Sequence, residues 1–228
     1  MHALVLALAL GMSSAPPTYV ALGDSTGVGV GAHAGGGYPA RLAARLGRAG
    51  RAVRLVNVCA SGARVADVVE GQLSSALAAA PALVTLGVGI NDVTRGTSPD
   101  AFARDYDRVS AALAAAGARV VVVNVPDLSL SPLAQGEETR RAIHARVATV
   151  NERIAAAARR HGFALVDLHA ATEAELARGD DLLSEDRFHP SDRGYERWTD
   201  LVQPAVERVL ASVGGARGPG LSPGRALR

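Results

Sequence analysis

The chain has 228 residues, enough for one large α/β domain, and its 48% hydrophobic and 20% charged residues argue against general disorder. The net charge of +2 is spread along the chain without a basic stripe, which argues against nucleic acid as a partner. All 24 positive side chains are arginines and Cys59 is the only cysteine, which excludes lysine-dependent chemistry and an intrachain disulfide.

Residues 1–17 precede the predicted domain, and two interpretations of them stay open. The run ALVLALALGM has the length of a signal-peptide core but lacks the preceding positive charge, and it is too short to span a bilayer. Alternatively, Met12 is the start of an ordinary soluble chain. The protein is accordingly either exported or cytoplasmic. We expect residues 18–212 to form the domain and the Gly- and Pro-rich residues 213–228 to be a disordered tail.

Short β-type runs alternate with helical patterns along the predicted domain. The fourth run is almost continuously apolar, as expected of a strand that is buried on both faces. The alternation predicts a parallel sheet with helices on both faces and right-handed crossovers. The five runs are Thr18–Leu22, Val53–Val58, Ala82–Val88, Arg119–Val125 and Ala164–Leu168.

Apolar residues at helical spacing predict the helices between these strands, and we expect each stripe to belong to the core. Ser98 is the expected N-cap of one helix, with Pro99 at its first position. The stripes are Leu42 and Leu46; Val65, Val69 and Leu73; Phe102, Tyr106, Val109 and Leu113; Ile143, Val147, Val150 and Ile154; and Trp198, Val202, Val206 and Val209.

Polar residues gather in the loops at one edge of this predicted sheet. In a parallel α/β sheet the active crevice lies at the carboxyl ends of the strands. Such a set can supply a nucleophile, a base, an acid that orients the base, and hydrogen-bond donors, which nucleophilic acyl transfer requires. The residues are Gly23, Asp24 and Ser25 after the first strand, Ser61 and Gly62 after the second, Asn91 and Asp92 after the third, and Asp186 and His189 before the last helix.

These four blocks, in this order, resemble those of the GDSL or SGNH hydrolases, a broad group of esterases and lipases. The resemblance covers roughly Thr18 to Leu210. It implies a three-layer α/β/α fold with a flavodoxin-like parallel sheet of five strands. Thr26 stands where the family often has leucine, which leaves the subgroup open.

The resemblance assigns Ser25 as the nucleophile, His189 as the base and Asp186 as the acid partner of the base. It places an oxyanion hole at the backbone N–H groups of Ser25 and Gly62 and at the side-chain amide of Asn91. These residue types suit the chemistry, because a serine hydroxyl needs a base within hydrogen-bond reach and imidazole titrates near neutral pH.

Several acids lie near His189, so the choice of Asp186 also needs an argument from spacing. A carboxylate three residues before the histidine can fold back to the ring within one turn of chain. Glu185 is offset by one residue, and Asp192 suits the first turn of the last helix. The other acids of this segment are Asp180 and Asp181.

The glycine-rich stretch Tyr19–Gly31 has competing explanations. A phosphate cradle of the G-x-x-x-x-G-K-[ST] type is excluded because the chain has no lysine. A plain turn explains the glycines but not the polar residues of the other loops. We expect these glycines to let a substrate approach the backbone closely. Asp24 and Asp92 are expected to be structural, each pinning its own loop by local hydrogen bonds.

The sequence thus predicts a serine hydrolase that cleaves carboxylic esters as a monomer. Its partner is a small-molecule ester, with no cofactor, no metal, no nucleic acid and no stable membrane insertion. A carbohydrate O-acetylesterase, an acyl thioesterase and, from another class, a catalytically dead binding protein of the same fold stay as alternatives. The loop Pro126–Gly136 follows the fourth strand, and its leucines, Leu128, Leu130 and Leu133, either line an acyl pocket or pack the loop down.

Overall fold

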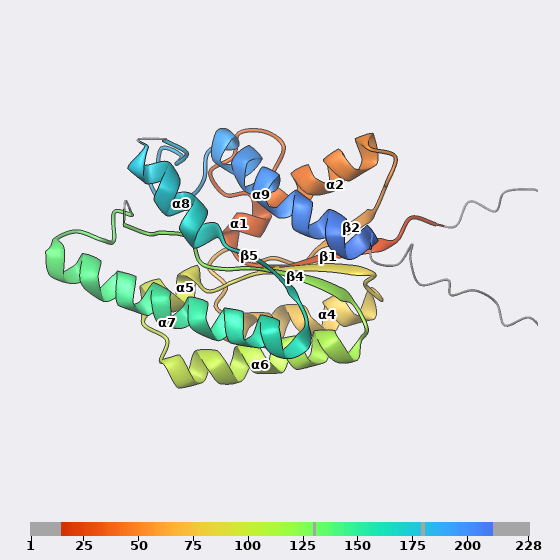
Figure 1. Cartoon of the computed structure of the whole chain (residues 1–228), viewed down its shortest axis with the longest axis horizontal. Coiled ribbons are helices and arrows are strands. Elements are labelled where there is room, and N and C mark those ends of the chain that lie inside the picture. Colours follow the sequence, from red (N-terminus) through yellow and green to blue (C-terminus); the bar gives the residue numbers. More distant parts are fainter. Residues whose placement is uncertain (1–14, 130, 179–180, 212–228) are drawn as a thin grey trace, which may run out of the picture.

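Five parallel strands form one sheet in the order β2-β1-β3-β4-β5 (Figure 1). This is the flavodoxin-like order, in which the sheet grows in both directions from the first strand. The predicted five-stranded parallel sheet is therefore confirmed. The strands are β1 (Thr18–Gly23), β2 (Arg54–Asn57), β3 (Leu83–Gly87), β4 (Arg119–Val123) and β5 (Ala164–Val166).

The computed structural model of the protein describes residues 15–129, 131–178 and 181–211. The expectations of a signal peptide or a start at Met12, and of a disordered tail over residues 213–228, lie outside these residues. None of the helices in the described ranges has both the length and the apolar character needed to cross a bilayer.

Helices cover both faces of the sheet and complete the three predicted layers (Figure 1). The helices are α1 (Ser25–Val28), α2 (Tyr38–Arg48), α3 (Val65–Asp67), the π-helical η1 (Val68–Gln72), α4 (Leu73–Ala78), α5 (Ile90–Arg95), α6 (Pro99–Ala115), α7 (Glu137–His161), α8 (Leu168–Ala177) and α9 (Asp192–Ala211). In Figure 1, α2, α8 and α9 lie on one side of the strands, and α4 to α7 lie on the other.

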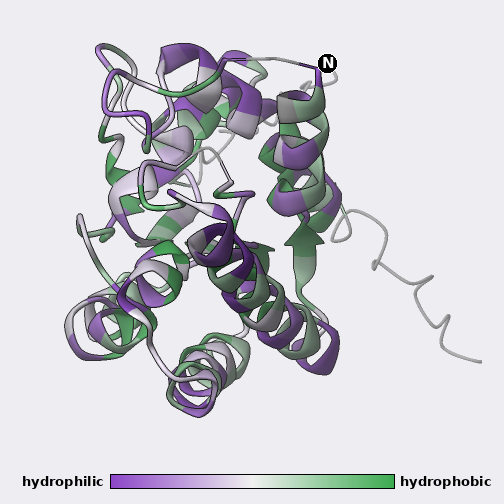
Figure 2. Ribbon diagram, turned by 90° about the vertical axis from the view of Figure 1, so that its left-hand side faces the viewer, coloured by the Kyte–Doolittle hydropathy of each residue, from purple (hydrophilic) through white to green (hydrophobic). Residues whose placement is uncertain are grey.

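Strand β4 shows how the two faces of the sheet share the core. Val120 and Val122 pack into the cluster with α6 and α7, whereas Val121 and Val123 pack into the cluster with α2 and α9. Side chains of a strand point alternately to opposite faces, so a strand covered on both faces is apolar at every position. Figure 2 shows hydrophobic colouring along the strands.

Helix α6 begins as its sequence predicts. The Ser98 hydroxyl accepts a hydrogen bond from the N–H of Ala101 at 3.3 Å, and Pro99 occupies the first helical position, where a missing N–H costs nothing. The apolar stripes of α6 and α7 are buried in the core as expected.

The prediction that Val65, Val69 and Leu73 form a buried stripe is only partly correct. Val68 is buried in the core, whereas Val69 is only half-buried and packs against its margin. The π-helical turn η1 then inserts one extra residue, which rotates the end of the turn relative to an α-helix and buries the polar Gln72.

Candidate active site

Ser25 lies at the junction of β1 and α1, at the carboxyl edge of the sheet. The strand ends at Gly23 and the helix begins at Ser25, so Asp24 becomes its N-cap. One carboxylate oxygen of Asp24 accepts hydrogen bonds from the N–H of Thr26 at 2.9 Å and from its hydroxyl at 2.8 Å. These bonds hold the first turn of α1, and with it the position of Ser25.

The structure brings Ser25, His189 and Asp186 into one hydrogen-bonded chain. Nε2 of His189 lies 2.9 Å from Oγ of Ser25, and Nδ1 lies 2.6 Å from Oδ2 of Asp186. Each ring nitrogen thus has one partner. With Nδ1 donating to the carboxylate, Nε2 is left as an acceptor that faces the serine hydroxyl.

The loop before α9 orients Asp186. Its Oδ1 accepts hydrogen bonds from the hydroxyl of Ser184 at 2.8 Å, the N–H of Phe188 at 2.9 Å and the N–H of His189 at 2.8 Å. Burial alone would raise the pKa of Asp186, but these bonds and the one from the His189 ring outweigh it. The pKa therefore lies well below its usual value, and Asp186 is ionised at neutral pH.

The neighbouring acids have other partners. The carboxylate of Asp181 pairs with Arg187 at 2.7 Å, and Glu185 is exposed. Asp192 begins α9, where it accepts backbone hydrogen bonds from His33 and Ala34 and pairs with Arg41 at 2.6 Å. Asp180 lies outside the described residues. Of the acids described in this segment, Asp186 alone is hydrogen-bonded to His189.

The loops after β2 and β3 lie against each other beside this chain. Nδ2 of the buried Asn91 donates to the carbonyl of Ala63 at 3.0 Å, which leaves its second N–H for another acceptor. Asp92, on α5, accepts a hydrogen bond at 3.0 Å from the N–H of Val65 at the start of α3, so it joins two segments that are distant in the chain. Gly62 has a φ of +78°, which favours glycine. Among the described residues, its N–H has no hydrogen-bond partner.

The glycines after Ser25 serve internal packing, which corrects the expectation that they face a substrate. A Cβ on Gly27 would lie 2.3 Å from the sulfur of Cys59, and a Cβ on Gly29 would lie 2.2 Å from the nitrogen of Gly37. A Cβ on Gly31 would lie 2.7 Å from the carbonyl oxygen of Pro190, in the loop that carries His189. These glycines let other parts of the chain pack closely around Ser25.

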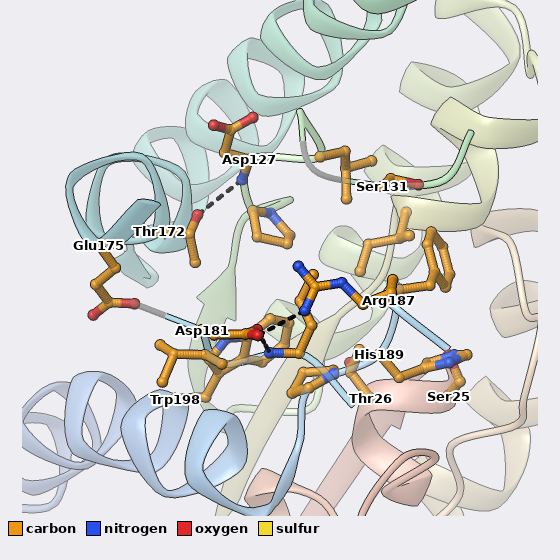
Figure 3. Close-up of a pocket in the computed structure, with 17 residues that line it drawn as sticks. Ser25, Thr26, Asp127, Ser131, Thr172, Glu175, Asp181, Arg187, His189 and Trp198 are labelled. Atoms are coloured by element: carbon orange, nitrogen blue, oxygen red, sulfur yellow. Dashed lines mark hydrogen bonds and ion pairs between the residues drawn. The ribbon is translucent and has the colours of Figure 1, made fainter. Parts of the chain in front are cut away.

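A pocket opens beside Ser25 and His189 (Figure 3). Figure 3 shows these two side chains at one end, with Arg187 between them and Thr172. Leu128 lines this pocket and also packs into the core. Leu133 is 52% exposed and lies elsewhere, and Leu130 lies outside the described residues. The remaining lining residues are Thr26, Ile90, Pro126, Asp127, Ser131, Glu175, Asp181, Leu182, Leu183, Phe188, Pro190 and Trp198.

Gln72 supports the site in a way that the sequence analysis missed. Its side-chain amide donates to the carbonyl of Gly23 at 2.8 Å and accepts from the N–H of Gly23 at 2.9 Å. The buried glutamine therefore braces the last residue of β1, next to Asp24 and Ser25. A local signal existed, since a glutamine beside Leu73 interrupts an otherwise apolar helical face.

No group of residues suited to binding a metal ion is found in the part of the chain that the structure describes. Within it, no three His, Cys, Asp or Glu side chains lie close enough together to hold a metal ion. The groups that come together at the site are instead a hydroxyl, an imidazole, a carboxylate and amide donors, a set suited to acyl transfer.

Comparisons with known proteins give a family and a set of similar structures. The sequence matches the model of the GDSL-like Lipase/Acylhydrolase family over residues 21–197. TesA is 26% identical, with a TM-score of 0.69, over 84% of this chain and 99% of that one. LAE5, an alpha/beta hydrolase enzyme from the metagenome of Lake Arreo, Spain, is 25% identical, with a TM-score of 0.70, over 86% of this chain and 97% of that one. Phospholipase A1 from Streptomyces albidoflavus NA297 is 26% identical, with a TM-score of 0.58, over 85% of this chain and 99% of that one. No curated protein sequence gives a significant match.

Proposed function

The chain belongs to the GDSL-like lipase/acylhydrolase family of hydrolases, and we propose that it cleaves carboxylic esters with Ser25 as the nucleophile. The observation that carries the proposal is the hydrogen-bond chain from Asp186 through His189 to Ser25, with lengths of 2.6 and 2.9 Å. Such a chain gives a serine hydroxyl the base that it needs at neutral pH. We also propose that residues 18–212 form the hydrolase domain.

In the proposed reaction, Nε2 of His189 takes the proton of Ser25 while Oγ attacks the carbonyl carbon of the ester. His189 then returns this proton to the leaving alkoxide, which departs as an alcohol and leaves an acyl group on Ser25. In the second half, His189 deprotonates a water molecule that attacks the acyl-enzyme. The carboxylic acid leaves and the serine hydroxyl is restored.

Each remaining group has a defined task in this scheme. Asp186 accepts the Nδ1–H of His189, which selects the reactive tautomer and stabilises the imidazolium. The N–H groups of Ser25 and Gly62 and the side-chain amide of Asn91 donate to the oxyanion of the tetrahedral intermediate. The N–H of Ser25 has no partner within α1, because the first turn of a helix leaves its N–H groups free. One such donor typically lowers the barrier by about 3–4 kcal/mol.

The pocket beside Ser25 supports an acyl substrate. Its wall is rich in apolar side chains, among them Ile90, Leu128 and Phe188, which suit a hydrocarbon chain better than a polar sugar ring. One of the similar structures is a phospholipase A1. We therefore place esters with a hydrocarbon acyl chain ahead of acetylated carbohydrates. Acyl thioesters are the nearest alternative, because they react by the same attack on a carbonyl carbon.

The test combines a fluorophosphonate probe, which labels an activated serine, with hydrolysis of p-nitrophenyl esters, acetylated sugars and acyl thioesters. The wild type should be labelled and should hydrolyse esters, whereas Ser25→Ala should do neither and keep its fold. Ser61→Ala is the matched control, since Ser61 is an exposed serine in the neighbouring loop. A folded wild type that takes up no probe and cleaves none of these substrates would instead identify a binding protein of the same fold.

A further inference from the structure

A second carboxylate, Asp24, lies directly beside Ser25 in the interior of the protein. It is 1% exposed. Its Oδ1 accepts both hydrogen bonds from Thr26, but its Oδ2 is buried and has no hydrogen-bond partner among the described residues. The N-cap role needs only one of the two oxygens, so it does not explain why this position carries a charge.

Asp24 lines a small cavity next to the pocket at Ser25. Tyr38 lines the same cavity and is 1% exposed, and its hydroxyl also has no partner among the described residues. The cavity has a volume of about 10 Å³, enough for one water molecule. Thr26, Ile90 and Trp198 line both this cavity and the pocket at Ser25, so the two spaces adjoin. With an exposed fraction of 1%, Asp24 is shielded from bulk water.

His189 is the one group of opposite charge that interacts electrostatically with Asp24, and its Nε2 lies 2.9 Å from Oγ of Ser25, the residue next to Asp24. Burial raises the pKa of Asp24 to about 6, while hydrogen bonds from Thr26 and the charge of His189 act in the opposite direction. Asp24 is therefore mostly ionised at neutral pH. Electrostatic interactions link it to Tyr38 on α2, Cys59 after β2, Asp92 on α5, His189 before α9 and Tyr195 on α9.

Of these five groups, only His189 can carry a positive charge. Burial raises the pKa values of Cys59, Tyr38 and Tyr195, which keeps all three neutral at neutral pH. Asp92 can only add negative charge. Within this set, His189 is thus the only group whose cationic form the negative charge of Asp24 can stabilise.

We propose that Asp24 is a positioning residue whose buried charge stabilises the imidazolium that forms when His189 takes the proton of Ser25. The inference rests on the proposed function, in which His189 is the base. Asp186 does the same through a direct hydrogen bond, but 46% of its side chain is exposed, so water screens its field. Asp24 is 1% exposed, so bulk water screens its field far less, and a preorganised charge in a buried site acts without reorganisation during the reaction.

The test is Asp24→Asn, which removes the charge and keeps the N-cap oxygen. We expect kcat for a p-nitrophenyl ester to fall about tenfold, with KM changed less than twofold, because the interaction strengthens only as His189 becomes charged. The acid limb of the pH–rate profile should move about one pH unit toward lower pH. The sign follows because loss of a nearby negative charge makes the imidazole easier to deprotonate.

Tyr38→Phe is the matched control. It removes a hydroxyl from the same cavity without changing any charge, so the acid limb should stay in place. Asp24→Ser is a second neutral variant that keeps an N-cap oxygen, and it should shift the limb as Asp24→Asn does. An acid limb that is the same in the wild type and both Asp24 variants would overturn the proposal, even if kcat fell.

An NMR titration of the His189 ring protons gives a readout that needs no turnover. The signal can be assigned with His189→Gln. Its midpoint should move about one pH unit toward acid in Asp24→Asn and remain unchanged in Tyr38→Phe. If the wild type cleaved no ester, this titration would still decide whether Asp24 acts on His189, so failure of the proposed function and failure of this inference are distinguishable.

Discussion

The Nε2 atom of His189 lies 2.9 Å from the hydroxyl oxygen of Ser25, although 164 residues separate them in the chain. The contact forms because Ser25 follows β1 at the carboxyl edge of the sheet and the loop before α9 folds back over the same edge. Gly31 permits the close approach, since a Cβ there would lie 3.0 Å from the Cβ of His189.

Asp186→Asn should lower kcat/KM for an ester roughly a thousandfold, because an amide at this position favours the unreactive tautomer of His189. The fold should persist, since an asparagine oxygen can still accept the N–H bonds of Phe188 and His189. Steady-state kinetics with thermal unfolding of each variant make the measurement. Glu185→Gln and Asp192→Asn are the controls and should change kcat/KM far less. Equal small losses in all three variants would mean that His189 works without a carboxylate partner from this loop.

Asn91→Ala should lower kcat about a hundred- to a thousandfold and leave KM nearly unchanged, because an oxyanion donor acts mainly in the transition state. The measurement is the separate determination of kcat and KM with one ester. The substitution also frees the carbonyl of Ala63, so the melting temperature must be recorded alongside. A rise in KM at constant kcat would instead identify Asn91 as a residue that positions the substrate.

Leu128→Ala should shift substrate preference toward longer acyl chains, because it removes a buried side chain from the wall of the pocket. The ratio of kcat/KM for an octanoate ester to that for an acetate ester should rise severalfold. The free energy of unfolding should fall by about 2–5 kcal/mol, as for other core leucines. Leu133→Ala, at an exposed position outside this pocket, is the control. An unchanged chain-length profile in Leu128→Ala would remove Leu128 from the acyl site.

The stability of the fold should depend on the ionisation of Asp24. Burial raises the pKa of Asp24 from 3.8 to about 6, so the folded state binds this proton more tightly than the unfolded state. The contribution of Asp24 to the free energy of unfolding is fully present below about pH 3.8, and it is lost as the pH rises through about 6. The loss amounts to roughly 3 kcal/mol, at about 1.4 kcal/mol per pKa unit.

Denaturant unfolding of the wild type and Asp24→Asn at pH 4 and pH 8 measures this effect. The difference in free energy of unfolding, variant minus wild type, should rise by roughly 3 kcal/mol between the two pH values. Other carboxylates are common to both proteins, so their contributions cancel in this difference. A constant difference would show that Asp24 has the same pKa in the folded and unfolded states. A variant that is more stable but slower would mean that the buried charge costs stability for the sake of activity.

Local patterns in the sequence were sufficient to predict the fold. The continuous valines of β4 and the N-cap of α6 at Ser98 depend on residues close together in the chain, and both agree with the structure. The four polar blocks could likewise be placed at one sheet edge, because the strand–helix alternation requires all parallel strands to end there. Sequence alone therefore predicted the architecture, and the resemblance of its polar blocks to those of the GDSL hydrolases assigned Ser25, Asp186 and His189 as a set.

The interior environment of each residue was decided only by the tertiary structure. The sequence does not reveal that Gly27 packs against Cys59, and Gly29 against Gly37, rather than against a substrate. Those contacts join segments that are distant in the chain. It does not reveal the π-turn that buries Gln72, since helix phase depends on what the helix packs against. Nor does it distinguish a local N-cap from a desolvated charge at Asp24. Desolvation is a property of everything that surrounds a group, and for Asp24 those surroundings come from α2, α5, α9 and two loops.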